Sequence, residues 1–276
     1  MFRQDLLAIV RPLPSDPRGL IYAGGIDDEG MIVGGKVASP SSGGTYEVKN
    51  GYVDLLKSSL GVDNFANLTN FLPGAGPAYE PLWRAHSLAL LTGEPFPADR
   101  ELRIISDLVG LESGGTYLDL GCSAGLYTRN LARLLDGRGE VVGIDLSPSM
   151  LKEAARRARR TGARPSFVRA DAHDLPFAEA SFSGAVCGGT LNELGDPARA
   201  LRETRRVLEG SGRLTVMGIL RARTARGLRL QRFFSVGGAR FFDPDELKSL
   251  FDHAGFEADS LRTHGLVFFL GATRRR

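Results

Sequence analysis

The chain has 276 residues, of which 42% are hydrophobic and 24% charged, and its formal net charge is +3 at pH 7. This predicts a globular cytoplasmic protein, because no apolar run approaches the roughly 18 residues of a membrane span and residues 1–7 lack a signal peptide's apolar run. Two cysteines and four scattered histidines fall short of the about four ligands of a structural zinc site, so we expect no metal and no disulfide.

Residues 1–60 differ in composition from the rest of the chain. They are rich in Gly, Pro and Ser, and turn signals separate short strand-like pieces at 20–23, 31–33 and 45–48. The pattern predicts a small antiparallel β module. Because so short a segment has little core of its own, it needs a staple or a larger partner to pack against.

Two stretches of this module carry a resemblance. The opening segment 5–10 (Asp-Leu-Leu-Ala-Ile-Val) and the exit 50–56 (Asn-Gly-Tyr-Val-Asp-Leu-Leu) resemble the zinc-ribbon-like module that precedes some bacterial methyltransferase domains. The cysteine pairs of that module are absent here. The resemblance implies a ribbon that has lost its metal and is held by packing against the main domain. An unrelated β-hairpin extension is the alternative interpretation.

Residues 61–98 are expected to form a helical bridge. Apolar residues recur at helical spacing between Tyr79 and Leu91, and a turn at 93–97 ends that helix. In methyltransferases the segment before the first core strand often covers the cofactor and the substrate. The resemblance therefore implies Tyr79, Trp83 and His86 as substrate-pocket candidates, although plain core packing also explains Trp83.

A regular alternation of strands and helices occupies residues 99–276. It is typical of a parallel sheet covered by helices, and it predicts a Rossmann-like α/β fold with seven strands, the last one antiparallel. The strands are expected at 117–120, 141–144, 165–169, 183–187, 213–217, 256–261 and 266–272. The main helices are expected at 99–108, 148–161, 197–208 and 244–254, with another ending at 135.

The first of these strands leads into a glycine-rich turn within the stretch 117–128 (Tyr-Leu-Asp-Leu-Gly-Cys-Ser-Ala-Gly-Leu-Tyr-Thr). Glycines let the backbone approach a ligand where a Cβ would clash. The second strand then ends in Asp145, whose carboxylate can accept hydrogen bonds from two ribose hydroxyls. A tight turn with a downstream acid is typical of nucleoside-binding βαβ units. The turn nevertheless differs from the G-x-G-x-x-G pattern of dinucleotide-binding proteins.

This turn resembles motif I of the class I S-adenosylmethionine-dependent methyltransferases, and two later stretches agree with it. Residues 171–177 (Asp-Ala-His-Asp-Leu-Pro-Phe) match the family's Asp-Ala-x-x-Leu-Pro-Phe run. Residues 203–212 are similar to its Glu-x-x-Arg-Val-Leu-x-Pro-Gly-Gly segment, with Gly210 and Ser211 replacing Pro and the first Gly. The resemblance covers roughly residues 100–273 and implies S-adenosylmethionine as cofactor and S-adenosylhomocysteine as product.

The resemblance also implies a role for each matching residue. The small residues of the turn shape the loop under the methionine part, Asp119 orders that loop or the ligand's ammonium group, and Asp145 holds the ribose. Leu146 and Met150 sandwich the adenine, for which core packing is the alternative, while Asp171 and Ala172 bind the adenine edge. The complete set of cofactor candidates is Asp119, Gly121, Ser123, Gly125, Tyr127, Asp145, Leu146, Met150, Asp171, Ala172 and Gly188.

The residues of catalysis are harder to predict. In this family a histidine often follows the fourth strand, and here Asn192 takes that position. Because asparagine cannot act as a base at pH 7, the substitution puts histidine-type base catalysis in doubt, and Glu193 and His173 are weak substitutes. Phe233 and Phe234 could line an acceptor pocket, or they could belong to an amphipathic lid helix.

Three functions follow from these residues. The first is methyl transfer to a small-molecule acceptor, as in the quinone and natural-product branch of the family. The second is methylation of RNA, of the ribosomal guanine type, and the third is a protein that binds S-adenosylmethionine without transferring a methyl group. Nucleic acid is the less favoured partner, because the basic runs at 156–160 and 274–276 are expected to be a solvated helix face and a tail.

Overall fold

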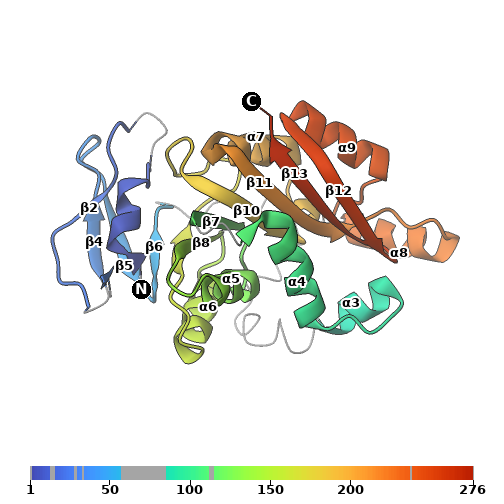
Figure 1. The fold of residues 1–276 in the computed structure, drawn as a ribbon, viewed down its shortest axis with the longest axis horizontal. Helices are drawn as coiled ribbons and strands as arrows, with labels where there is room; N and C mark the ends of the chain where they lie inside the picture. The colour runs from blue at the N-terminus through green and yellow to red at the C-terminus, as the bar shows by residue number, and fades with distance from the viewer. Residues whose placement is uncertain are drawn as a thin grey trace.

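The chain folds around one long, twisted β-sheet, seen here in a computed structural model (Figure 1). The structure describes residues 2–12, 16–27, 30–32, 34–56, 85–111, 115–236 and 238–275, with the side chains of 85–87, 233 and 234 left out. Tyr79 and Trp83 therefore lie outside the described residues. The side chains of His86, Phe233 and Phe234 lie outside them too.

Seven strands make up the central part of the sheet. They are β7 (Gly115–Leu120), β8 (Gly139–Asp145), β9 (Ser166–Arg169), β10 (Phe182–Gly188), β11 (Leu208–Ile219), β12 (Phe256–His264) and β13 (Val267–Arg274). Their order is β9-β8-β7-β10-β11-β13-β12, and β13 runs antiparallel to both of its neighbours. The predicted Rossmann-like sheet with an antiparallel last strand is confirmed.

Helices cover both faces of this sheet. The helices are α3 (Ala85–Thr92), α4 (Ala98–Val109), α5 (Leu126–Leu135), α6 (Pro148–Arg160), α7 (Pro197–Val207), α8 (Ala225–Val236) and α9 (Pro244–His253). On β7, Leu118 and Leu120 belong to the core cluster that contains α7 and α9, whereas Tyr117 belongs to the one that contains α4 and α5. Successive side chains of the strand thus point to opposite faces of the sheet and pack into different core clusters.

Local sequence signals set the starts of two helices next to the strand tips. The Ser147 hydroxyl accepts a hydrogen bond from the backbone N–H of Met150, and Pro148 follows as the first helical residue of α6. The Asp196 carboxylate accepts in the same way from the N–H of Arg199 at the start of α7, at 2.9 Å. Such caps satisfy N–H groups that a helix leaves without internal partners.

The N-terminal strands continue the central sheet. The short strands are β1 (Phe2–Arg3), β2 (Ile21–Tyr22), β3 (Met31–Ile32), β4 (Gly35–Ala38), β5 (Thr45–Lys49) and β6 (Tyr52–Asp54), with the 3-10 helix η1 at Gln4–Ala8. β6 pairs in parallel with β9, so that β2, β4, β5 and β6 extend the sheet to eleven strands. Figure 1 shows these strands at one end of the molecule.

The junction between the two parts is tightly bonded. Arg169 on β9 forms an ion pair with Asp54 on β6, with Nη1 and Oδ1 3.3 Å apart. The backbone N–H of Arg11 donates to the carbonyl of Pro176 at 2.8 Å. Phe2 and Phe177 belong to the same buried core cluster. The assignment of residues 1–60 to a metal-free ribbon and of 61–98 to a bridge stays a prediction.

Two general expectations can be compared with the described residues. Within the ranges given above, no cluster of histidine, cysteine, aspartate or glutamate has the arrangement of a metal site. None of the described helices combines the length and apolar character needed to cross a membrane. Cys122 and Cys187 are both buried free thiols.

Candidate functional site

A pocket of about 1000 Å³, its open mouth included, lies where β7, β8, β9 and β10 end. In an open parallel α/β sheet this carboxyl edge is where ligands bind. The pocket is lined by Asp119, Gly121, Cys122, Ser123, Ala124, Leu126, Tyr127, Ile144, Asp145, Leu146, Ser147, Ala170, Asp171, Ala172, Gly188, Gly189, Thr190, Glu193 and Leu194.

The turn after β7 forms the floor of this pocket in an unusual backbone conformation. Gly121 has a φ of +64°, and an added Cβ there would lie 2.2 Å from Oγ1 of Thr190. Ser123 also has a positive φ, +48°, a backbone conformation that residues other than glycine rarely adopt. The Ser123 N–H donates to Oδ2 of Asp145 at 2.9 Å, and this bond holds the strained residue in place.

Asp119 supports the turn from below. Its side chain is buried, and its Oδ2 atom accepts hydrogen bonds from the backbone N–H and the hydroxyl of Thr128, at 2.9 and 2.6 Å. Both bonds tie the end of β7 to the first turn of α5. Of the two predicted roles for Asp119, this geometry supports ordering of the loop.

Asp145 stands at the tip of β8 and faces the pocket. Its Oδ1 atom accepts from the N–H of Ser147 at 2.8 Å and its Oδ2 atom from the N–H of Ser123 at 2.9 Å. Burial raises the pKa of Asp145, and these backbone hydrogen bonds partly offset the rise. Each carboxylate oxygen keeps a further lone pair, so the group can still accept from two hydroxyls of a ligand.

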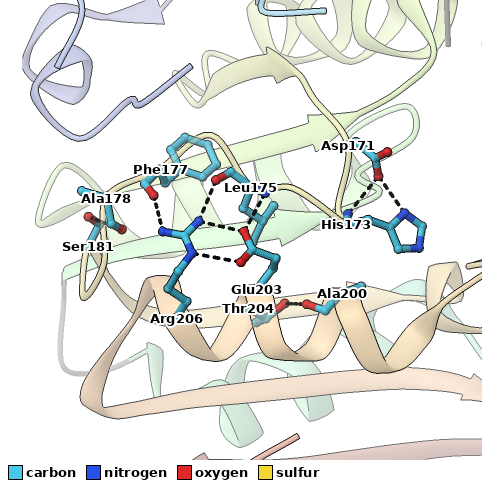
Figure 2. A network of polar contacts seen from close by, with 10 residues as sticks. All are labelled: Asp171, His173, Leu175, Phe177, Ala178, Ser181, Ala200, Glu203, Thr204 and Arg206. Carbon is cyan, nitrogen blue, oxygen red and sulfur yellow. Dashed lines mark hydrogen bonds and ion pairs between the residues drawn. The ribbon is translucent and has the colours of Figure 1, made fainter. Parts of the chain in front are cut away.

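The loop after β9 carries Asp171 and Ala172 into the pocket. Oδ1 of Asp171 accepts from both the backbone N–H and Nδ1 of His173, each at 2.8 Å (Figure 2). Hydrogen bonding to Asp171 raises the pKa of His173. Burial raises the pKa of Asp171, but the bonds from His173 outweigh it and the net shift is downward. His173 therefore acts as a partner of Asp171 and does not line the pocket.

Two side chains of α7 hold this loop against the domain. The Arg206 guanidinium donates to the carbonyls of Leu175 and Phe177 at 2.8 and 2.7 Å, and it also pairs with Glu203 (Figure 2). Glu203 in turn accepts from the backbone N–H of Leu175 at 3.0 Å. The Glu-x-x-Arg spacing places both side chains on one face of the helix. We call this group of contacts the α7 clamp.

Gly188, the last residue of β10, leaves room for an aromatic side chain. A Cβ at this position would lie 2.2 Å from Cε2 of Tyr127, so only glycine fits without displacing the ring. The Tyr127 hydroxyl donates to the buried carboxyl group of Glu101 on α4, which holds the ring in place. Tyr127 and Gly188 both line the pocket.

Asn192 has a structural role in this fold. Its Nδ2 atom donates to the carbonyls of Ile219 and Arg240, at 2.9 and 2.6 Å, and its Oδ1 atom accepts from the N–H of Ile219 at 2.9 Å. Asn192 is buried and lies outside the pocket lining. Both amide N–H donors are used, so the side chain connects the chain after β10 to the two ends of the segment that contains α8.

We expect Asn192→Ala to lower stability more than cofactor affinity. The substitution leaves three backbone groups without this partner, and an unpaired buried polar group costs about 1–3 kcal/mol, so a loss of about 3 kcal/mol is expected. Urea unfolding measures it. Asn130→Ala is the matched control, because its amide makes a single bond along α5, to Leu126. Unchanged stability with a collapsed transfer rate would instead assign Asn192 to catalysis.

Glu193, one residue further on, does line the pocket. Burial raises the pKa of Glu193 to about 7, and the negative charge of Asp145 adds to the rise. The group therefore changes charge near neutral pH, where a general base works best. Of the three catalytic candidates, only this one lies at the pocket.

The remaining sequence candidates fall into two groups. Nine of the eleven cofactor candidates line the pocket, whereas Gly125 and Met150 do not. Met150 is buried beneath the turn, with the Ser123 hydroxyl 3.6 Å from its sulfur, which agrees with the core-packing alternative. The lining residues that were not among the candidates include Cys122, Thr190 and Leu194. Cys122 lies inside the glycine-rich turn, and this position could have predicted it as a lining residue. Thr190 and Leu194, which follow β10, belong to no recognisable motif.

The charge of the pocket restricts its ligand. Four carboxylates line it, from Asp119, Asp145, Asp171 and Glu193, and no lysine, arginine or histidine is found among its described lining residues. Such a surface repels a pyrophosphate and attracts a cation. S-adenosylmethionine carries a sulfonium and an ammonium group, a ribose diol and an adenine. The acidic lining, the strand-tip Asp145 and the room left by Gly188 fit this ligand.

Comparison with known proteins agrees with the site. The family model "Methyltransferase domain" matches residues 118–216. A 2-phytyl-1,4-naphtoquinone methyltransferase of Trichormus variabilis is 33% identical over 45% of this chain and 56% of its own length. The chain spans about half the length of this relative and of two other similar proteins. A ubiquinone/menaquinone biosynthesis C-methyltransferase of Haemophilus ducreyi is 30% identical over 56% of this chain and 70% of its own.

A solved structure gives the same fold. The [4+2]-cyclase SpnF superposes with a TM-score of 0.57 and 23% identity, over 68% of this chain and 91% of that chain. At this identity the likeness shows the fold alone. The Haemophilus relative, the family model, the strand order and the pocket agree, and the chain belongs to the class I S-adenosylmethionine-dependent methyltransferases.

Proposed function

We propose that this chain transfers the methyl group of S-adenosylmethionine to a small-molecule acceptor in the cytoplasm and releases S-adenosylhomocysteine. The observation that carries the proposal is the pocket at the strand tips, which combines four carboxylates with no described basic side chain. When bound, S-adenosylmethionine supplies an electrophilic methyl group on a sulfonium. The protein has to hold that group, align the acceptor with it and exclude water.

Four residues account for the binding. Asp145 accepts from the ribose hydroxyls, and its two backbone hydrogen bonds fix its orientation before any ligand arrives. Asp171 and the backbone of Ala172 face the adenine edge, on the loop that the α7 clamp holds in place. Leu146 lines the pocket next to Asp145 and packs against the adenine ring.

Alignment of acceptor and methyl group supplies most of the rate. Holding two reactants in a reactive geometry is worth about 7–11 kcal/mol of the barrier. An acceptor that reacts through carbon or a hydroxyl must also lose a proton. Glu193 is the group in the described part of the pocket whose pKa, about 7, suits it to take that proton.

The acceptor class rests on the similarity to named relatives. The Trichormus and Haemophilus proteins are named for quinone methylation, and we infer a small organic acceptor for this chain as well. RNA methylation remains the alternative. The acidic lining of the pocket argues against it, because a nucleic acid strand entering the pocket would be repelled.

Titration calorimetry with S-adenosylmethionine, S-adenosylhomocysteine and NAD tests the proposal. We expect micromolar binding of the first two and none of NAD, whose pyrophosphate meets the four carboxylates. Incubation with labelled S-adenosylmethionine and a panel of quinols and phenols, which can lose a proton to the base, then identifies the acceptor by transfer of label. Absence of binding by a folded protein would overturn the proposal.

A further inference from the structure

The segment between β11 and α9 forms a basic surface next to the pocket. Residues 221–240 contain six arginines and no aspartate or glutamate. Arg221 pairs with Asp243 and Glu246, and Arg240 pairs with Glu246. The other four, Arg223, Arg226, Arg229 and Arg232, are exposed, and no ion pair joins them to the part of the chain that the structure describes.

Helix α8 presents three of these arginines together with apolar side chains. Arg226, Arg229 and Arg232 follow one another at a spacing of three, so they lie on one side of the helix. Val236 falls on the same side and is 88% exposed, and Leu230 lies at its border, four residues after Arg226, and is 55% exposed. We call this side of α8, with its three arginines and two apolar residues, the outer face.

The opposite side of α8 is anchored to the domain. Gln231 is buried, its Oε1 atom accepts from the N–H of Ala222 at 2.8 Å, and its Nε2 atom donates to the carbonyl of Leu220 at 2.9 Å. These hydrogen bonds fix the rotation of α8 about its axis, so that the outer face points away from the domain. A fixed row of arginines beside exposed aliphatic groups is typical of helices that lie in the interface of an anionic membrane.

The basic segment also lies close to the pocket. Asn192 binds Ile219 before the segment and Arg240 at its end, and Asn192 directly precedes the pocket residue Glu193. Figure 1 shows α8 beyond the ends of β11 and β12, at the opposite end of the molecule from the N-terminal strands. A surface that contacts α8 therefore lies on the side of the sheet where the parallel strands have their carboxyl ends, which is also the side of the pocket.

We propose that the outer face of α8 docks the protein onto an anionic phospholipid surface. Arg226, Arg229 and Arg232, which form no ion pair with the residues that the structure describes, supply the charge complementarity. Leu230 and Val236 enter the boundary between headgroups and acyl chains. Leu230 and Val236 are aliphatic and suit acyl chains better than bases, which stack on aromatic rings. The inference concerns binding alone and does not depend on the transfer reaction.

Flotation with vesicles tests the docking surface. We expect the protein to float with phosphatidylcholine vesicles that contain phosphatidylglycerol and not with phosphatidylcholine alone. Raising the salt from about 0.01 M to about 0.15 M, which shortens the Debye length from about 30 to 8 Å, should weaken the binding. The triple variant R226Q/R229Q/R232Q should bind about 100-fold more weakly, since each arginine near the surface is worth about fivefold.

A matched variant separates this surface from net charge. R133Q/R159Q/R160Q removes three exposed arginines from α5 and α6, which cover the sheet itself, and should float like the unchanged protein. Leu230→Ser tests the apolar contribution and should weaken binding without changing charge. Equal losses in the two triple variants would overturn the proposal. So would retention of vesicle binding by R226Q/R229Q/R232Q, or tighter binding to a non-specific RNA than to the anionic vesicles.

Discussion

Asp145→Ala is expected to weaken the binding of S-adenosylmethionine and S-adenosylhomocysteine by about 10²-fold or more. The proposed ribose contacts are hydrogen bonds to a charged acceptor, each worth about 1.5–3 kcal/mol. Losing two of them weakens binding by at least about 3 kcal/mol, or about 10²-fold in the dissociation constant. Titration calorimetry on the variant and the unchanged protein measures the difference.

The control must separate binding from folding, because Asp145 also accepts from Ser123 and Ser147. Asp107→Ala removes an exposed carboxylate on α4 and should bind both ligands normally. Thermal unfolding without ligand shows how far each variant is destabilised. An Asp145→Ala protein that unfolds like the unchanged one and binds S-adenosylhomocysteine with undiminished affinity would remove Asp145 from the site.

Glu193→Gln is expected to lower the transfer rate by about 10² to 10⁴-fold, which is the usual contribution of a general base. The pKa of Glu193 is about 7 in the folded protein, so its carboxylate form becomes abundant above pH 7. The transfer rate of the unchanged protein should therefore rise with pH through 7 and level off. The variant should lose this rise, while its affinity for S-adenosylhomocysteine stays within a few-fold.

The same substitution should change stability in a direction that the pKa dictates. Folding raises the pKa of Glu193 from 4.5 to about 7, so the folded state favours the protonated carboxyl group. This contribution to stability is present below pH 4.5 and is lost as pH rises through 7. Glu193→Gln should accordingly unfold at a higher temperature than the unchanged protein at pH 8. The difference should disappear near pH 4.

Glu209→Gln, an exposed carboxylate on β11, is the matched control and should change neither the pH profile nor the melting temperature. If Glu193→Gln keeps both the rate and its rise through pH 7, the base lies elsewhere.

The sequence predicted the central sheet because its signals are local. Each core strand is a short apolar run bounded by turn residues, and proline opens α6, α7 and α9. Asp145 and Asp171 were predictable for a related reason. Asp145 is the last residue of β8 and Asp171 lies two residues after β9, and parallel strands bring their carboxyl ends to one edge of the sheet.

The features that sequence reasoning missed depend on distant partners. Asn192 looked like a substitute for a catalytic histidine, yet its side chain binds residues 27 and 48 positions away. Glu193 was predicted only as a weak substitute base, because the burial and the nearby Asp145 that raise its pKa arise from the fold. β6 has three residues and pairs with β9 across more than a hundred positions, which no local pattern shows.

The pairing of β6 with β9 also orders the events of folding. Asp54 and Arg169, which join the two strands, are 115 residues apart in sequence. During synthesis the N-terminal strands leave the ribosome first, but the edge that they join exists only after β9 has been made. Because non-local contacts form slowly, we expect the earliest part of the chain to be the last to gain protection from hydrogen exchange. Until then the unpaired edge of β6 is open to neighbouring chains, which makes this junction the point most exposed to aggregation during refolding.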